Sequence, residues 1–451
     1  LNAAVGGTNP LSSLTVTTGA LTSDAIKLNG ALTVNNSTTS TISGAITDGA
    51  SAANLVKAQN GILTISGNNT FTGSTAVNAG TLKIVNDDPT AYLAATSGIT
   101  GSGNLTIESA GSDFSSAIST TKVTGTFIDL TIGKSGNTQT INLSNDITTT
   151  SDQRYNGPVI LSGGNRTLTA GTSSDNIFFE STVDSDGTAR SLTVSAGTNS
   201  GGVITFTGAV GGNSELSGLT SDSNLFKAGS NITLAGLLDV DIYGNSQSSN
   251  YGIAGGILDG TSPASFSKGG RSNRWLEVYG NNNYTGATTI KAGYLRITND
   301  SPQSFLNNTT FTGPGHLQIR PNSTNFSSVL SMSDINFTGT SINELYLGRS
   351  GTNTKLVLDE DISTGNEIHI YMPVEVNGGD RSITATNDNI RFYQTINSDT
   401  SARTLTLDSG NGNVRIDGAV GNSAPLNNIN IIAEALTAGA ITLNGALTAT
   451  L

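Results

Sequence analysis

The stretch LVKAQNGILTISGNNTFTGSTAVNAGTLKIVNDDP, residues 55–89, decides the fold because the chain repeats it. The second version, FSKGGRSNRWLEVYGNNNYTGATTIKAGYLRITNDSP, covers residues 266–302. Gly67 returns as Gly280, and Gly80 returns as Gly293. Both pairs have the same offset (280 − 67 = 293 − 80 = 213). A constant offset between identical residues indicates internal duplication, so the chain is expected to repeat one structural unit.

Each version contains short alternating runs bounded by Gly and Asn. Leu63 and Ile65 flank a Thr, and Leu82 and Ile84 flank a Lys. Alternation with period 2 predicts half-buried strands, and Gly and Asn supply the positive-φ positions that tight corners need. Leu63 and Leu82 play the same role in successive runs, at an offset of 82 − 63 = 19. This spacing predicts a coil of about 20 residues. No window has a helical period with capping residues, so almost no helix is expected.

These features predict an all-β fold, a right-handed parallel β-helix (β-solenoid) built from tandem units of roughly 210 residues. In a solenoid each strand pairs with the coils above and below, so like residues stack. Small Thr and Asn side chains can then cover the outside while Val, Ile and Leu fill the inside. A β-sandwich is less suitable, since its strands seldom repeat over hundreds of residues.

Longer-range markers divide the chain. Related runs begin at Val5 (VGGTNPLSSLTV), Val210 (VGGNSELSGLT) and Val420 (VGNSAPLNNI). They predict one solenoid unit over residues 5–209, a second over 210–419, and the start of a third over 420–451. The chain begins and ends at nearly the same point of its repeat. Two interpretations fit this observation: a slice of one giant chain, or a subunit that stacks head to tail into a fibre. Further coils of the same or a neighbouring chain are expected to cover both ends.

Composition excludes several classes of function. Only 12% of the 451 residues are charged, and the net charge is −12 without a basic block, which is unlike a nucleic-acid-binding protein. The chain contains no Cys, so disulfides, zinc–thiolate sites and Cys nucleophiles are absent. No run approaches the roughly 20 apolar residues of a membrane helix, so no membrane span is expected. The first residues, LNAAVGGTNP, lack a signal-peptide pattern, and we expect a mature or internal piece.

Residues 55–84 resemble the passenger-associated repeat of bacterial autotransporters, with a Gly-rich lead, then GNNTFTG, then NAGTLKI. Residues 266–297 resemble it too, with GNNNYTG and KAGYLRI. The remainder, in runs such as FTGAVGG (206–212) and ITLNGALT (441–448), is similar to filamentous-haemagglutinin-like surface exoproteins. This resemblance implies an extracellular or cell-surface protein that acts in adhesion, cell–cell contact or matrix structure. Its candidate partners are glycans or proteins of a host, a neighbouring cell or a matrix.

The few candidate catalytic residues have simpler interpretations. His316 follows a Gly-Pro-Gly turn and His369 lies in an alternating run, so we interpret both as surface or corner residues rather than general bases. Phe71 and Tyr284 share one slot of the repeat, which indicates an aromatic side chain filling a solenoid corner.

Acidic clusters support an alternative function. Asp239 and Asp241 fall on one strand face, and Asp359, Glu360 and Asp361 form the densest acidic run. Such groups could bind Ca²⁺ or act as acid and base in a glycan-active β-helix enzyme of the polysaccharide lyase or hydrolase type. We interpret both clusters as solvated corners. The sequence therefore predicts a non-enzymatic protein with no catalytic, cofactor-binding or metal-binding residues.

Overall fold

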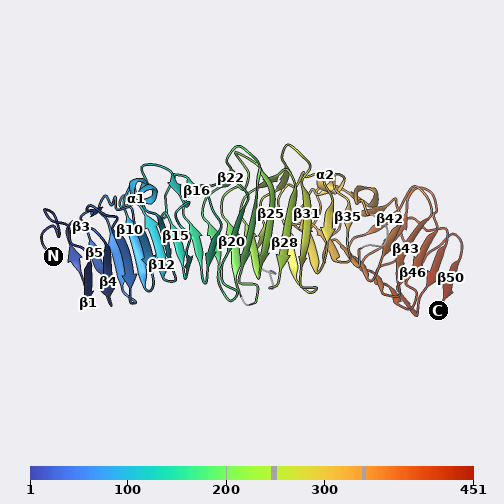
Figure 1. The fold of residues 1–451 in the computed structure, drawn as a ribbon. Coiled ribbons are helices and arrows are strands. Elements are labelled where there is room, and N and C mark those ends of the chain that lie inside the picture. Colours follow the sequence, from blue (N-terminus) through green and yellow to red (C-terminus); the bar gives the residue numbers. More distant parts are fainter. Residues whose placement is uncertain (200, 245–250, 338–341) are drawn as a thin grey trace. The chain divides into compact units, whose positions relative to one another are not determined.

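A computed structural model describes residues 1–199, 201–244, 251–337 and 342–451 of the chain. The fold is an all-β parallel β-solenoid of about 18 turns with almost no helix (Figure 1). It comprises two compact units, Leu1–Thr233 and Leu234–Leu451. Every strand pair described within these units is parallel, which confirms the predicted solenoid class.

Each coil passes three strand positions, and the strands at each position form one face. We call these faces the first, middle and third. In Leu1–Thr233 the first face contains β1 (Leu14–Thr18), β4 (Ala31–Asn36), β7 (Asn54–Ala58), β9 (Ser74–Val77), β11 (Gly98–Gly101), β14 (Thr126–Phe127), β17 (Ile147–Thr149), β20 (Arg166–Thr169), β23 (Arg190–Ala196) and β25 (Leu216–Ser223). The middle face contains β2 (Thr22–Ser23), β5 (Ser40–Ile42), β8 (Ile62–Ile65), β10 (Thr81–Val85), β12 (Asn104–Glu108), β15 (Leu130–Ile132), β18 (Gln153–Tyr155), β21 (Ile177–Phe179), β24 (Val203–Phe206) and β26 (Leu225–Ala228). The third face contains β3 (Ile26–Leu28), β6 (Ile46–Asp48), β13 (Ile118–Ser119), β16 (Ile141–Leu143), β19 (Val159–Leu161) and β22 (Val183–Ser185). The boundary between the units falls inside β27 (Ile232–Leu234).

The unit Leu234–Leu451 repeats the three faces. Its first face contains β28 (Leu237–Ile242), β31 (Ser265–Gly270), β33 (Thr288–Ile290), β35 (Phe311–Thr312), β40 (Ile362–Thr364), β43 (Arg381–Ala385), β46 (Leu405–Asp408), β48 (Ile429–Ile432) and β50 (Leu447–Thr450). Its middle face contains β29 (Gly252–Ile253), β32 (Trp275–Val278), β34 (Tyr294–Thr298), β36 (His316–Arg320), β38 (Glu344–Leu347), β41 (Ile368–Ile370), β44 (Ile390–Phe392), β47 (Asn413–Ile416) and β49 (Ala435–Ala438). Its third face contains β30 (Ile257–Asp259), β37 (Leu330–Ser331), β39 (Leu356–Leu358), β42 (Val374–Val376) and β45 (Ile396–Ser398). The helices are α1 (Thr90–Ala95), α2 (Gln303–Leu306) and the 3₁₀ turn η1 (Met332–Asp334).

In the core, residues at equivalent positions of successive coils stack on one another. Leu63, Leu82, Leu105 and Leu130 are consecutive register partners on the middle face, and each is at most 1% exposed. Burying one such side chain contributes roughly 1.5–3 kcal/mol. Stacked Leu and Ile stabilise these coils, and in later coils the aromatic rings of Tyr155, Phe179, Phe206 and Phe226 stack in the core.

Coil length is more variable than the sequence predicts. The numbering advances by 82 − 63 = 19 from Leu63 to its partner Leu82, but then by 105 − 82 = 23 and by 130 − 105 = 25. The expectation of about 20 residues per coil is therefore too short for these later coils. The extra residues lie in the corners between strands. One example is the corner after β10, which contains α1, and the strands on either side keep their register.

The duplicated stretch folds into duplicated elements. Residues 55–89 contribute to β7, β8, β9 and β10 before α1, and residues 266–302 contribute to β31, β32, β33 and β34 before α2. Lys57 and Lys268 are fully buried at equivalent places. The Lys57 ammonium donates to the carbonyl of Ala79 at 3.1 Å, and the Lys268 ammonium donates to that of Ala292 at 2.7 Å. The acceptors keep the sequence offset (292 − 79 = 213), whereas the lysines differ by 268 − 57 = 211, because the second copy has two more residues between the lysine and the matching glycine.

Three further expectations about the repeat stay predictions. They are the right-handed sense of the coil, the tandem unit of roughly 210 residues, and the unit boundaries at 209/210 and 419/420.

Candidate functional site

The first acidic candidates lie on the outer face of β28. Asp239 and Asp241 are half-buried and alternate with buried residues, so they share one face as the sequence predicts. Both Asp239 carboxylate oxygens accept hydrogen bonds from the Lys291 ammonium at 2.9 Å. Burial lowers the pKa of the Lys268 ammonium to about 8, and the nearby Asp241 carboxylate opposes that shift in part. Each carboxylate therefore has a cationic neighbour.

The second acidic candidates form a corner between β39 and β40. Asp359 accepts a hydrogen bond from the Ser333 backbone N–H at 3.0 Å and one from its hydroxyl at 2.6 Å. Asp361 accepts one from the Ser382 backbone N–H at 2.8 Å. Glu360, between them, is exposed. The two Asp side chains thus connect neighbouring coils, and they do not converge with Asp239 and Asp241 on one site.

Acidic side chains at other corners act in the same way. We call an Asp or Asn side chain that accepts a backbone N–H from an adjacent coil a cross-coil acceptor. Further examples are Asp48, Asp113, Asp146, Asp152, Asp300 and Asp380. Five of these six hydrogen bonds are exposed and that of Asp152 is half-buried, so each contributes about 0.5–1.5 kcal/mol. These Asp residues therefore have a role in connecting the coils of the fold.

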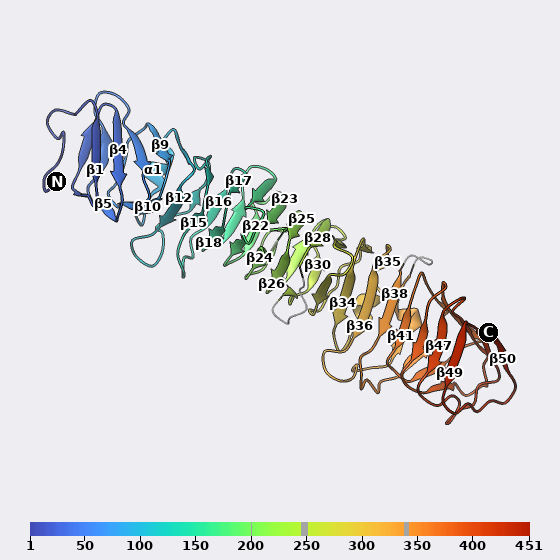
Figure 2. The ribbon, with the colours of Figure 1, turned by 90° about the horizontal axis from the view of Figure 1, so that it is seen from below.

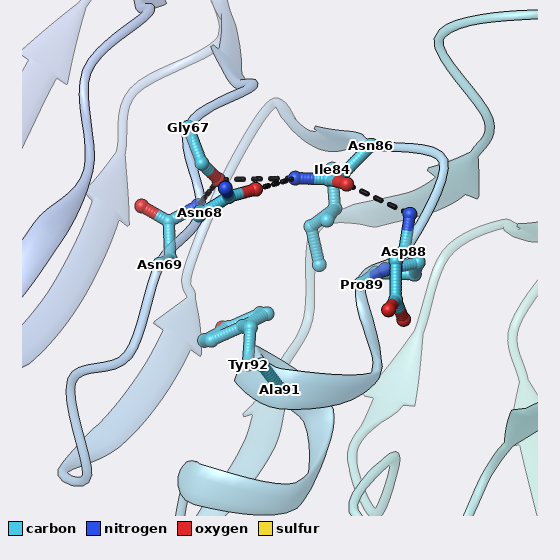
Figure 3. Close-up of a pocket in the computed structure, with 9 residues that line it drawn as sticks. All are labelled: Gly67, Asn68, Asn69, Ile84, Asn86, Asp88, Pro89, Ala91 and Tyr92. Carbon is cyan, nitrogen blue, oxygen red and sulfur yellow. Dashed lines mark hydrogen bonds between the residues drawn. The ribbon is translucent and has the colours of Figure 1, made fainter. Parts of the chain in front are cut away.

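A pocket of about 270 Å³ lies on the duplicated stretch itself, and Figure 3 shows its lining residues. The Asn86 amide donates to the side-chain oxygen of Asn68 at 3.0 Å and accepts from the Asp88 backbone N–H at 2.8 Å. At the equivalent place, the Asn299 amide makes the same two contacts at 3.3 and 2.8 Å. Because the duplicated corner keeps this network, we assign it to the fold.

The two histidines lie on the middle face of Leu234–Leu451. His316 begins β36, with Nδ1 3.2 Å from the Glu344 carboxylate, and His369 lies in β41, with Nε2 2.9 Å from the Glu367 carboxylate. Their side chains are only 13% and 15% exposed. His316 stacks on Tyr294 with centroids 4.2 Å apart. The structure thus gives both histidines a carboxylate and an aromatic neighbour.

A row of large polar side chains runs through this face. Figure 2 labels β34, β36, β38, β41, β47 and β49 along this face, and β44 pairs with both β41 and β47 between them. At one outward position, the register partners are charged, aromatic or amide-bearing in seven consecutive strands and end in a Thr. We call this set the charged row: Glu277, Arg296, Gln318, Tyr346, His369, Arg391, Arg415 and Thr437.

The same position in Leu1–Thr233 has a different character. Six of its ten residues are Thr; the set is Thr22, Thr41, Thr64, Lys83, Thr106, Thr131, Arg154, Phe178, Thr205 and Lys227. We call it the threonine row. A solenoid coil therefore folds with a small β-branched residue at this position. The larger side chains of the charged row exceed what the fold requires.

Charges at the start of the charged row are fully paired. The Glu277 carboxylate is 3% exposed and lies 2.6 Å from the Arg320 guanidinium and 3.6 Å from that of Arg296. Burial alone would raise the pKa of Glu277, but the Thr298 hydroxyl and the two guanidinium groups outweigh it, so the pKa is lowered. Arg296 also lies over the Trp275 ring at 4.1 Å. At this end of the row the charges are therefore buried and paired with one another.

The other end of the row is open. A groove of about 350 Å³ is lined by Glu367, His369, Asn389, Ile390, Arg391, Asn413, Val414, Arg415 and Thr437. Arg391 and Arg415 are register partners on adjacent strands, and their side chains are 33% and 52% exposed. Asp417 accepts from Arg391 at 2.9 Å and from the Nε of Arg415 at 2.6 Å. The groove thus combines two guanidinium groups with amide and hydroxyl groups.

Aromatic rings support the groove from the side. Tyr371 and Tyr393 stack with centroids 4.0 Å apart, and the Arg391 guanidinium lies over the Tyr393 ring at 4.2 Å. The Tyr393 hydroxyl is 3.0 Å from the Nδ1 of His369. Burial raises the pKa of the Tyr371 hydroxyl, with hydrogen bonding to Tyr393 as the next cause, so this phenol stays neutral near pH 7. The stacked rings hold Arg391 and His369 in fixed orientations.

Sequence reasoning did not find this groove. Its residues are spread along the sequence (391 − 369 = 22 and 415 − 391 = 24), and they only meet once the coil lengths are known. A signal was present, however. The triplets Ile368-His369-Ile370, Ile390-Arg391-Phe392 and Val414-Arg415-Ile416 replace the Leu-Thr-Ile triplets of the first unit, and the middle residue of each points outward.

Within the described ranges, none of the helices has the length and apolar composition needed to cross a membrane.

Comparisons with known proteins agree with the duplicated stretch. Residues 55–84 and 276–297 match the family model of the passenger-associated-transport-repeat. Neither the curated proteins nor the solved structures provide a match. The first matched segment runs from within β7 into β10, and the second runs from within β32 into β34. The chain therefore carries two passenger-associated-transport-repeats, and a β-solenoid with this repeat fits an autotransporter passenger.

Proposed function

We propose that this chain is a non-enzymatic segment of an extracellular or cell-surface β-solenoid, acting in adhesion, cell–cell contact or matrix structure. The observation that carries the proposal is the pair of passenger-associated-transport-repeats within a parallel β-solenoid. Repeat solenoids present an extended surface that is suited to contact with other molecules. Tandem units over 5–209 and 210–419, and further coils at both ends, are part of the same proposal.

The roles of the acidic residues support a structural function over a catalytic one. Asp239 binds Lys291, while Asp359 and Asp361 accept cross-coil hydrogen bonds. A general acid or a nucleophile needs a carboxyl group that can reach a substrate and change its protonation or bonding state. These three carboxylates instead connect one coil with another.

An adhesion assay tests the proposal. The purified chain is coupled to fluorescent beads, and the beads are mixed with one another, with epithelial cells and with extracellular matrix. We expect the beads to aggregate or to bind cells or matrix above the level of beads coated with albumin. Beads that stay dispersed and bind neither cells nor matrix would contradict an adhesive or matrix role.

A depolymerisation assay tests the alternative enzyme. The chain is incubated with acidic polysaccharides in the presence of Ca²⁺, and the release of reducing or unsaturated ends is followed. We expect no release above the buffer rate. Release that is abolished in Asp239→Asn or Asp359→Asn would establish the enzymatic alternative and end the non-enzymatic proposal.

A further inference from the structure

We propose that the open groove on the middle face of Leu234–Leu451 binds an acidic polysaccharide, with Arg391 and Arg415 receiving its carboxylates. This inference rests on the proposed surface function and names the class of partner. The groove-forming groups are Glu367, His369, Asn389, Arg391, Asn413, Arg415 and Thr437, taken from four successive strands or the residues just before them.

The two units carry different side chains at the position of the charged row. The threonine row shows that small side chains are sufficient for the fold at this position. In the charged row, His369, Arg391 and Arg415 occupy three consecutive strands. Long charged side chains cost conformational entropy when they are held in place. At the outer surface this cost is poorly offset, since exposed ion pairs contribute about 0–1 kcal/mol. We therefore infer that these side chains serve binding.

The spacing of the two arginines fits a polymer that carries carboxylates. Arg391 and Arg415 lie on hydrogen-bonded parallel strands, which are about 4.8 Å apart. Stacking on Tyr393 fixes the Arg391 guanidinium, and Asp417 holds both arginines on one side. A planar guanidinium binds a carboxylate through paired N–H donors, so two fixed forks at this spacing suit carboxylates along a polymer.

Neutral hydrogen-bonding groups lie beside the two arginines. Asn389 accepts from the Asn413 side-chain amide at 3.1 Å, so the two amides form a short line beside the arginines. Asn413 and Thr437 are exposed. Amide, hydroxyl and carboxylate groups bind sugar hydroxyls as donors and acceptors. Alternating carboxylate and hydroxyl groups are the chemistry of a uronic-acid polymer, and the line of strands suits a chain lying across several coils.

Charge supports an acidic polysaccharide over a nucleic acid. The chain lacks the basic block of a nucleic-acid-binding protein, and only 12% of its residues are charged. In the groove, Arg391 and Arg415 are opposed by Asp417 and Glu367, so the local charge is balanced when His369 is neutral. A polymer that carries hydroxyl groups beside each carboxylate can contact the amides and Thr437 of the groove as well as its arginines.

The test is affinity electrophoresis of the full chain through gels containing polygalacturonate, with dextran gels as the neutral comparison. We expect retardation by polygalacturonate and little by dextran. Arg391→Thr and Arg415→Thr, which install the residue of the threonine row, are each expected to weaken binding about tenfold.

Arg154→Thr is the matched control. Arg154 belongs to the threonine row, lies over the Phe178 ring at 4.0 Å and pairs with Glu180, so it repeats the surroundings of Arg391. It carries the same charge, and its substitution is expected to change binding less than twofold. Circular dichroism and the melting temperature establish that all three variants fold.

Four results would overturn the inference: no retardation of the folded chain by polygalacturonate, equal retardation by dextran, unchanged binding in folded Arg391→Thr and Arg415→Thr, or an equal loss in Arg154→Thr. Adhesion of beads carrying a chain that does not bind polygalacturonate would leave the proposed surface function intact and remove this partner alone.

Discussion

The two units fill one buried aromatic slot in opposite ways. In the first, Phe71 packs on Tyr92 of α1 with centroids 5.0 Å apart, and the Tyr92 hydroxyl lies 2.6 Å from the Thr75 hydroxyl. In the second, the tyrosine and phenylalanine have exchanged places: Tyr284 packs on Phe305 of α2 at 5.1 Å. The predicted aromatic corner is confirmed. In each unit the tyrosine hydroxyl contacts the equivalent threonine, although the tyrosine comes from the helix in the first unit and from the corner in the second.

The Tyr284 hydroxyl lies 2.6 Å from that of Thr288, which is the counterpart of Thr75 (288 − 75 = 213). This exchange predicts the effect of substitutions. Tyr92→Phe should lower the free energy of unfolding by about 1 kcal/mol, because the buried Thr75 hydroxyl loses a partner. Adding Phe71→Tyr should restore most of the loss, since it copies the second unit. Urea unfolding monitored by circular dichroism measures both; a double variant no more stable than Tyr92→Phe would contradict the account.

At the scale of strands and corners, cross-coil acceptors connect successive turns. Asp48 accepts from the Ala53 backbone N–H at 2.7 Å, and from the backbone N–H and hydroxyl of Thr72 at 3.0 and 2.7 Å. Asp259 repeats this arrangement with Ala264 and Thr285. One side chain thereby satisfies two backbone donors from different parts of the corner.

Asp48→Ala should therefore lower the free energy of unfolding by about 1–3 kcal/mol, because two backbone N–H groups lose their acceptor. Asp48→Asn should lose less, since the amide oxygen can still accept. Asp24→Ala is the control: Asp24 is exposed, and its replacement should change stability by less than about 0.5 kcal/mol. Equal urea midpoints for Asp48→Ala and Asp24→Ala would show that the acceptor is unimportant.

Sequence reasoning predicted the strand elements well where the duplication was strict. Leu63 and Ile65 do point inward in β8, and Leu82 and Ile84 do so in β10. It underestimated later coils, because corner loops vary in length without disturbing the inward pattern. It could not place the groove, because outward residues such as Arg391 obey no packing rule and become neighbours only through the coil length.

At the scale of the molecule, paired carboxylates make stability depend on pH. A hydrogen bond from Arg403 is the main cause that lowers the pKa of Asp399 to about 2, and Arg190 likewise holds the pKa of Asp186 below its usual range. A carboxyl group with a lower pKa in the folded state stabilises the fold above its unfolded pKa, near 3.9. That stability is lost as the pH falls through the folded pKa.

The melting temperature should accordingly change little between pH 7 and about 5 and then fall steadily between about pH 4 and pH 2. Asp399→Asn should show a smaller fall over the same window, since one titrating pair is gone. Circular dichroism melts at pH 7, 4, 3 and 2 provide the measurement. A melting temperature that is constant down to pH 2 would contradict a stabilising role for these ion pairs.

Successive runs of the sequence form adjacent parallel coils in the stated register, and cysteine cross-linking measures this adjacency. The chain contains no Cys, so only the two introduced cysteines can form a disulfide within one chain. Thr106 and Thr131 are register partners on adjacent strands, whereas Thr64 and Thr106 are separated by the strand of Lys83. Adjacent strands are about 4.8 Å apart, within the range that a disulfide bridges, and strands two steps apart are about twice as far.

Under mild oxidation, Thr106→Cys/Thr131→Cys should form an intramolecular disulfide, and Thr64→Cys/Thr106→Cys should not. Mass spectrometry of proteolytic peptides identifies the cross-link in each variant. A disulfide in the second pair, or none in the first when both variants are folded, would contradict the solenoid register.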